Sequence, residues 1–139
     1  MTVTLRRFTD WPGRLSAFLA EKEREAFAWG RNDCCLFTAD AVAALTGVDP
    51  AADWRGAYDN EDAAQVLLDA AGGLARLVTA ALGSDTRQLV GFARRGDLVL
   101  AAGAVGVVDD TGARVALYAR DRGLVRAPLR LATVAWRVG

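Results

Sequence analysis

The spacing of hydrophobic residues changes near residue 91, and this change restricts the fold more than any other feature. Before it, apolar residues recur at helical spacing, and helices are expected over about 11–25, 34–45, 61–71 and 74–82. After it, short runs rich in β-branched residues predict strands at 98–100, 105–108, 115–118, 124–126 and 133–138. Because short turns join neighbouring strands in antiparallel pairs, the sequence predicts an α+β fold, with three or four helices before a five- or six-stranded antiparallel sheet.

The length of 139 residues fits one domain over 1–139, with a helical half at about 10–83 and a β half at about 95–138. No apolar run approaches the roughly 20 residues of a membrane span. Residues 1–10 lack the apolar centre of a secretory signal. We therefore expect a protein that is made in the cytoplasm and that does not span a membrane.

Charge and residue types exclude several classes of function. Basic and acidic residues number 17 each, so the net charge is zero, and nucleic acid is not expected as a partner. The chain has no histidine, which excludes histidine-based acid–base catalysis by the chain itself. Two cysteines are the only soft metal ligands, so a zinc site of the usual kind is disfavoured, and we expect neither metal nor cofactor.

Acidic residues near the predicted helix starts are candidates for caps. Asp10 is expected to cap the first helix, and either Asn32 or Asp33 to cap the second. Asp40 lies inside the second helix among apolar residues. It could face solvent or pair with an arginine of the sheet, and the sequence leaves both possibilities open.

In the β half, Asp97 is expected at a strand entry, paired with Arg94 or Arg95. Such an exposed pair is worth only ~0–1 kcal/mol. Gly106 is expected where neighbouring elements pack closely. The tryptophans are expected in the core or at its rim: Trp11, Trp29, Trp54 and Trp136. Four arginines are expected along a solvated sheet edge, with docking of an acidic partner as the alternative: Arg120, Arg122, Arg126 and Arg130.

The stretch 29–34, Trp-Gly-Arg-Asn-Asp-Cys, has the strongest link to chemistry. A cysteine in the first turn of a helix lies at the positive end of the helix dipole, which favours the thiolate. The neighbouring Asp33 opposes this effect through like-charge repulsion. Cys34 could be a nucleophile, although a small buried side chain at a helix start is the simpler interpretation. Without a histidine base nearby, we expect Cys34 not to be an activated thiolate.

These residues resemble the NlpC-type cysteine peptidases. The matching positions around the family nucleophile are Trp29, Gly30, Asp33 and Cys34, and Cys35 stands where those enzymes usually have serine. A second match is the strand sequence Gly96, Asp97, Leu98 and Val99, and the likeness covers about 27–45 and 95–138. The resemblance implies a papain-like fold. It also implies descent from enzymes that cut the peptide stems of bacterial cell walls and that phage tails often carry.

A second resemblance is to a small family encoded among phage tail genes. It rests on Asp-Cys-Cys-Leu-Phe at 33–37 with Ala-Asp-Ala at 39–41, Gly-Gly-Leu at 72–74, and Ala-Trp-Arg-Val at 135–138. This likeness implies a protein made in the bacterial cytoplasm and assembled into a virion tail. The implied partners are other phage tail proteins and, if a groove persists, cell-wall peptide.

The chain departs from the peptidases at two of their three catalytic positions. Ala104 stands where the peptidases have the histidine base, and the polar third position falls in the apolar stretch 115–117. Loss of such a base typically costs several orders of magnitude in rate. We therefore expect a degenerate NlpC-like domain that acts as a structural or binding module of a tail tip or baseplate.

Two alternatives stay open at this stage. One is an active cell-wall peptidase or amidase in which Cys34 works with a base other than histidine, or with a base supplied by a partner subunit. The other is an accessory protein of tail assembly that is absent from the finished particle.

Overall fold

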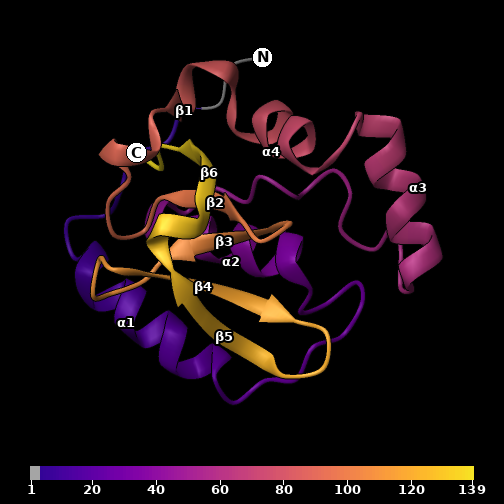
Figure 1. Ribbon diagram of the computed structural model, residues 1–139, viewed down its shortest axis with the longest axis horizontal. Coiled ribbons are helices and arrows are strands. Elements are labelled where there is room, and N and C mark those ends of the chain that lie inside the picture. The colour runs from indigo at the N-terminus through magenta and orange to yellow at the C-terminus, as the bar shows by residue number, and fades with distance from the viewer. Residues whose placement is uncertain (1–3) are drawn as a thin grey trace.

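The computed structural model describes residues 4–139 and contains four α-helices followed by a six-stranded antiparallel sheet (Figure 1). The helices are α1 (Trp11–Lys22), α2 (Cys34–Thr46), α3 (Glu61–Ala71) and α4 (Leu74–Leu82). The strands are β1 (Arg87–Gln88), β2 (Leu98–Ala101), β3 (Ala104–Val108), β4 (Arg114–Ala119), β5 (Gly123–Pro128) and β6 (Ala132–Trp136). Short 3₁₀ turns are η1 (Ser84–Thr86), η2 (Val90–Phe92) and η3 (Leu129–Leu131). The predicted α+β class is confirmed.

The strand order in the sheet is β1-β6-β2-β3-β4-β5. β2 to β5 follow one another as antiparallel neighbours, and β6 returns to pair with the other edge of β2. β1 adds two residues beyond β6. The sequence analysis did not predict β1, because two residues are too few to show the period-two alternation of a strand.

The main core lies between α2 and one face of the sheet. Phe37, Val42 and Leu45 of α2 are fully buried in one cluster with Val105 and Val107 of β3. α1 adds its own apolar side chains to this cluster, and Figure 1 shows α2 behind the central strands with α1 along the lower edge. The alternation along β3 therefore turns every second side chain toward the helices.

The opposite face of the sheet has a second, smaller cluster. Val99, Val108 and Val115 are fully buried there. Two short turns supply its cover, since Val90 of η2 and Leu129 of η3 pack against the same cluster. The chain thus covers this face with 3₁₀ turns rather than with a second layer of helices.

The structure confirms one predicted cap and corrects the other. Asp33 is the N-cap of α2, and its carboxylate accepts a hydrogen bond of 2.9 Å from the backbone N–H of Leu36. Asp10 precedes α1 but makes no side-chain cap, because its carboxylate instead accepts from Arg14 one turn later. Asp10 is thus the N-cap residue of α1, as predicted, but its side chain does not make the predicted capping hydrogen bond.

α1 is also shorter than predicted, since it ends at Lys22 rather than near residue 25. The carbonyl oxygens of Lys22 and Glu25 both accept from the Tyr118 hydroxyl, at 2.6 and 3.0 Å. These long-range bonds satisfy carbonyl groups that another helical turn would have used. A local pattern of apolar residues could not reveal a partner on β4.

Asp40 pairs with two cations, and neither belongs to the sheet. Lys22 donates to one carboxylate oxygen of Asp40 at 3.1 Å, and Arg55 donates to the other at 2.6 Å. Lys22 is only 8% exposed and also donates to Glu25 and Asn32. Burial alone would lower the pKa of Lys22, but its acidic partners Glu25 and Asp40 raise it. The cluster ties α1, α2 and the following loop together.

Asp97 is buried, and its side-chain partner is not one of the predicted arginines. Its carboxylate accepts from Arg7 at 2.8 Å, from Gln88 at 2.9 Å and from the backbone N–H of Arg94 at 3.1 Å. The predicted side-chain pairing of Asp97 with Arg94 or Arg95 was therefore wrong. The actual partner lies 90 residues away in sequence, beyond the reach of local reasoning.

The predicted solvated row of arginines is also partly wrong. Arg126 is half-buried and pairs with Glu23, Asp109 and Asp110. Arg120, Arg122 and Arg130 are exposed, as expected.

No single helix within residues 4–139 is long and apolar enough to cross a membrane, and the bent pair α3–α4 meets such criteria only when its halves are joined.

Candidate functional site

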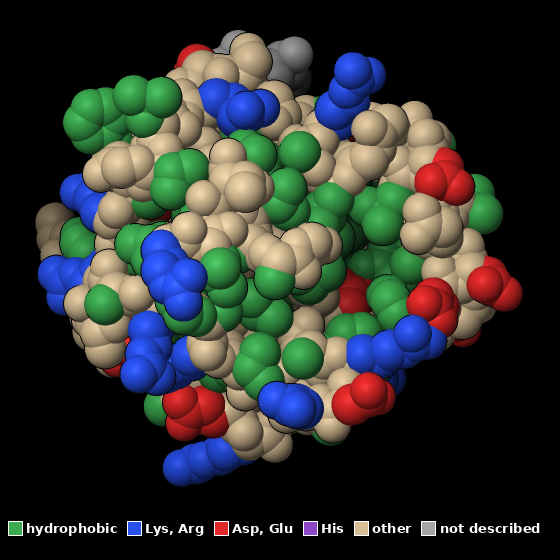
Figure 2. Space-filling model, viewed as in Figure 1, with side chains coloured by type: hydrophobic (Ala, Val, Ile, Leu, Met, Phe, Trp, Pro, Cys, Tyr) green, Lys and Arg blue, Asp and Glu red, His purple; other side chains and the backbone are tan. Residues whose placement is uncertain are grey.

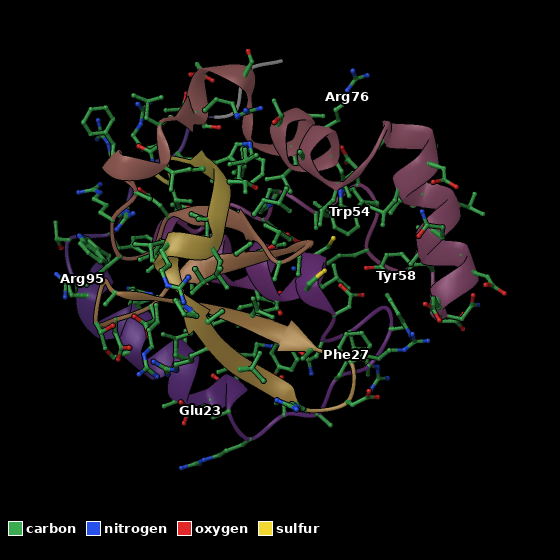
Figure 3. All side chains as sticks on the ribbon, in the orientation of Figure 1. Glu23, Phe27, Trp54, Tyr58, Arg76 and Arg95 are labelled. Carbon is green, nitrogen blue, oxygen red and sulfur yellow. The ribbon has the colours of Figure 1, made fainter. Side chains whose placement is uncertain are left out.

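Both cysteines border a pocket at the N-terminus of α2. Its wall consists mainly of apolar side chains from α3, α4 and the loop between α2 and α3. Figure 3 shows the sulfur atoms at the start of α2, on the side that faces Trp54 and Tyr58. In Figure 2 a hollow lined by hydrophobic side chains lies between the sheet and α3. The lining residues are Trp29, Asp33, Cys34, Cys35, Trp54, Tyr58, Ala64, Leu67, Leu68, Leu74, Leu77 and Gly103.

The loop before α2 explains why glycine and aspartate occur in the Trp-Gly-x-x-Asp-Cys stretch. Gly30 has a φ of +80°, and a Cβ there would lie 2.3 Å from the carbonyl oxygen of Tyr58. Only glycine allows this conformation and this close approach. The carboxylate of Asp33 accepts from the backbone N–H of Gly30 at 3.0 Å and from that of Leu36. The motif therefore shapes the entry to α2.

Asp33 is buried and fully occupied as a hydrogen-bond acceptor. Beside the two backbone N–H groups, the Tyr58 hydroxyl donates to it at 2.5 Å. Burial and the Asp33 carboxylate raise the pKa of Tyr58 far above its ordinary value. These three donors hold the carboxylate at the start of α2. Asp33 is thus a structural cap and not a substitute for the missing histidine.

The neighbouring thiols of Cys34 and Cys35 shift each other's pKa in opposite directions. Donation from the Cys35 thiol lowers the pKa of Cys34, although burial and the Asp33 carboxylate oppose the shift. The same hydrogen bond, together with burial, raises the pKa of Cys35 far above its ordinary value. The backbone N–H of Val105 also favours the Cys34 thiolate. The expectation that Cys34 is not an activated thiolate stays a prediction.

The side chain of Ala104 cannot act as a base, and it lies on the face of the sheet opposite to Cys34. Its neighbour Val105 turns into the core between the helices and the sheet, where Cys34 also packs. Ala104 packs with the cluster on the opposite face. The predicted third position, around residues 115–117, holds Val115, Ala116 and Leu117, which are all buried. Within residues 4–139, no imidazole can take a proton from Cys34.

Gly96 and Asp97 of the second matching stretch lie far from the pocket. A Cβ on Gly96 would come within 2.8 Å of the Leu45 side chain, near the C-terminal end of α2. Cys34 begins the same helix, about 16 Å away at 1.5 Å of rise per residue. Gly96 and Asp97 therefore anchor the sheet against the end of α2 and take no part in the pocket around Cys34.

Sequence reasoning missed most of the pocket wall. Trp54 and Tyr58 come from a loop without periodicity, and their rings stack with centroids 6.4 Å apart. Leu67 and Leu74 were assigned to helices, but no signal indicated which surface these helices would cover. The close approach of Gly30 to Tyr58 was also invisible in sequence. Among residues 4–139, no group of three or more histidine, cysteine or acidic side chains could hold a metal ion.

Comparison with known proteins places the chain in a family. Residues 6–138 match the family described as Domain of unknown function (DUF6950), and the chain belongs to this family. No curated protein and no solved structure shows a significant match to the chain.

Proposed function

We propose that this protein is a catalytically degenerate domain with the papain-like, NlpC-type fold, and that it serves as a structural or binding module of a phage tail. One observation carries the proposal. A cysteine occupies the nucleophile position at the start of α2 beside an apolar pocket. In β3, alanine (Ala104) occupies the position where the peptidases have the histidine base. The phage context comes from the sequence resemblance described above.

Several features support a binding role over hydrolysis. Peptide cleavage needs a base for the nucleophile and for water, and an acid for the departing amine. Asp33 is the nearest carboxylate in sequence, and three donors already occupy it. The pocket nevertheless keeps aromatic and aliphatic walls of the kind that hold a ligand or a partner side chain. Loss of the base therefore abolishes peptide hydrolysis and leaves a pocket that can bind a partner.

A second candidate function rests on the acidity of Cys34. Because its pKa is lowered, Cys34 would need less help to form a thiolate than an ordinary thiol. An active cell-wall peptidase or amidase could then arise if a neighbouring tail subunit supplied the base. This alternative predicts that the protein cleaves its substrate only within the assembled particle.

Alanine variants in a phage that carries this gene test both functions. We expect mass spectrometry to detect the protein in purified particles, and Cys34→Ala particles to assemble and infect normally. Cys35→Ala is the matched control, because it removes a neighbouring thiol of the same pocket. Loss of infectivity for Cys34→Ala alone, with normal particle numbers, would contradict the degenerate module and favour the enzyme. Absence from purified particles would instead indicate an assembly factor.

A further inference from the structure

Residues 87–95, here called the basic segment, expose large apolar side chains among arginines. Leu89 and Phe92 are 71% and 70% exposed. Three arginines lie in this segment, and residues 86–96 contain no acidic residue. Their inward-facing neighbours Val90 and Ala93 already cover the sheet. Leu89 and Phe92 therefore contribute little to the fold, and their exposure is typical of a contact surface.

Arg94 and Arg95 form no ion pair with an aspartate or glutamate among residues 4–139. Their guanidinium groups lie over the Trp11 ring, at 5.9 and 5.1 Å from its centroid. Arg94 also donates to the Gly139 carbonyl oxygen. Two exposed positive charges thus lie beside exposed apolar side chains, without an aspartate or glutamate to pair with them.

The outer face of α3 has the opposite character. Residues 59–71 contain four acidic residues and no basic one. Asp62, Val66 and Asp69 follow at helical spacing, all are exposed, and Val66 is 68% exposed. The helix dipole favours acidic residues in the first turn but disfavours Asp69 near the C-terminal end. Asp62 and Asp69 form no ion pair with a described cation, so this acidic and apolar face is also left unneutralised.

The two surfaces lie at opposite ends of the molecule. Figure 1 shows α3 at one end of the longest axis and the C-terminus at the other. The basic segment lies beside the C-terminus, since Arg94 donates to Gly139. Figure 3 places Arg95 at the edge opposite α3, and Figure 2 shows acidic side chains gathered over the α3 side. A chain of zero net charge is therefore polarised along its length.

We propose that copies of this protein associate head to tail, with the basic segment of one copy docking on the α3 face of the next. In such a contact Arg94 and Arg95 would meet Asp62 and Asp69, and the apolar side chains would be buried together. Contact of either surface with its own copy would instead place like charges together, which disfavours a symmetric dimer. A head-to-tail contact repeats, so it generates a ring or a filament. This inference does not depend on the degenerate-peptidase proposal.

Two charge-reversal variants test the geometry. Asp62→Arg/Asp69→Arg reverses the charge of the α3 face, and Arg94→Asp/Arg95→Asp reverses the charge of the basic segment. Light scattering during size-exclusion chromatography should show wild-type mass rising above the monomer between about 10 μM and 1 mM, a range suited to a weak contact. Each variant alone should stay monomeric. An equimolar mixture should associate again, because the two intact surfaces match and the two reversed surfaces also carry opposite charges.

Several outcomes would overturn the proposal. A wild-type protein that stays monomeric throughout this range at low salt would contradict it. If the wild type associates but an equimolar mixture of the two variants does not, the copies associate through a different contact. Retained association in either variant would do the same, and circular dichroism of both variants confirms that each is folded. Binding of the basic segment to an acidic protein of another kind, without self-association, would identify a different occupant. None of these changes touches the pocket at Cys34, so infectivity of Cys34→Ala tests the other proposal separately.

Discussion

Replacing Arg7 by alanine should destabilise the protein more than any exposed charge change. The Arg7 side chain is 5% exposed and donates to the Asp97 carboxylate at 2.8 Å, to the carbonyl oxygen of Val138 at 2.5 Å and to that of Arg95 at 2.7 Å. Removing it leaves the carboxylate of Asp97, itself 1% exposed, without its cation. Breaking a buried pair in this way costs about 3–5 kcal/mol, a large share of the roughly 5–15 kcal/mol that holds a domain folded.

Urea unfolding measures this effect. With a slope of about 2 kcal/mol per molar urea, a loss of ~4 kcal/mol lowers the midpoint by about 2 M. Arg14→Ala is the matched control, because Arg14 forms an exposed pair with Asp10 and should cost no more than ~1 kcal/mol. The double variant Arg7→Ala/Asp97→Ala should be less destabilised than the sum of the single variants. A cost below ~1 kcal/mol for Arg7→Ala would refute the reasoning.

Three further predictions concern the cysteine pair, acid stability and the tight strand pairing. Cys35→Ala removes the thiol that donates to Cys34, so the pKa of Cys34 should rise and its alkylation near neutral pH should slow, measured against the Cys35→Ser variant. Burial alone would raise the pKa of Asp109, but Thr111 and Arg126 hold it below 3.8. The ionised Asp109 carboxylate therefore stabilises the folded protein above pH 3.8, and this stabilisation is lost in stronger acid. Asp109→Asn should accordingly lower the free energy of unfolding less when unfolding is measured below pH 3.8. Gly106→Ala places a Cβ 2.6 Å from the carbonyl oxygen of Ala116 and should lower the melting temperature, whereas an unchanged value would show that the strands can separate.

Much of the fold followed from periodicity, but its long-range contacts did not. The spacing of apolar residues predicted α2 and α4 to within a residue or two at each end, and the close packing at Gly106 is confirmed. Asp33 was correctly included among the candidate caps because an N-cap bond spans only three residues. Asp97 was assigned the wrong partner because Arg7 lies far away in sequence. Local patterns determine helix starts, whereas partners across the fold depend on packing.

The candidate site was predictable in part for the same reason. The position of Cys34 at a helix start follows from the local sequence, and so does the absence of histidine. The pocket wall depends on how α3, α4 and the loop with Tyr58 fold over α2, which no local pattern describes. The effect of the Cys35 thiol on the pKa of Cys34 also depends on the folded structure, which the sequence alone does not describe.

Incubation with cell-wall stem peptide tests the central claim most directly. The purified protein, with Cys34→Ala as control, would be held with soluble muropeptides, and mass spectrometry would follow the peptide bonds. The account predicts no cleavage above the Cys34→Ala control, because the chain has no histidine and Asp33 is engaged as the cap of α2. Cleavage that depends on Cys34 would contradict it, and would show that this chain hydrolyses peptides without histidine.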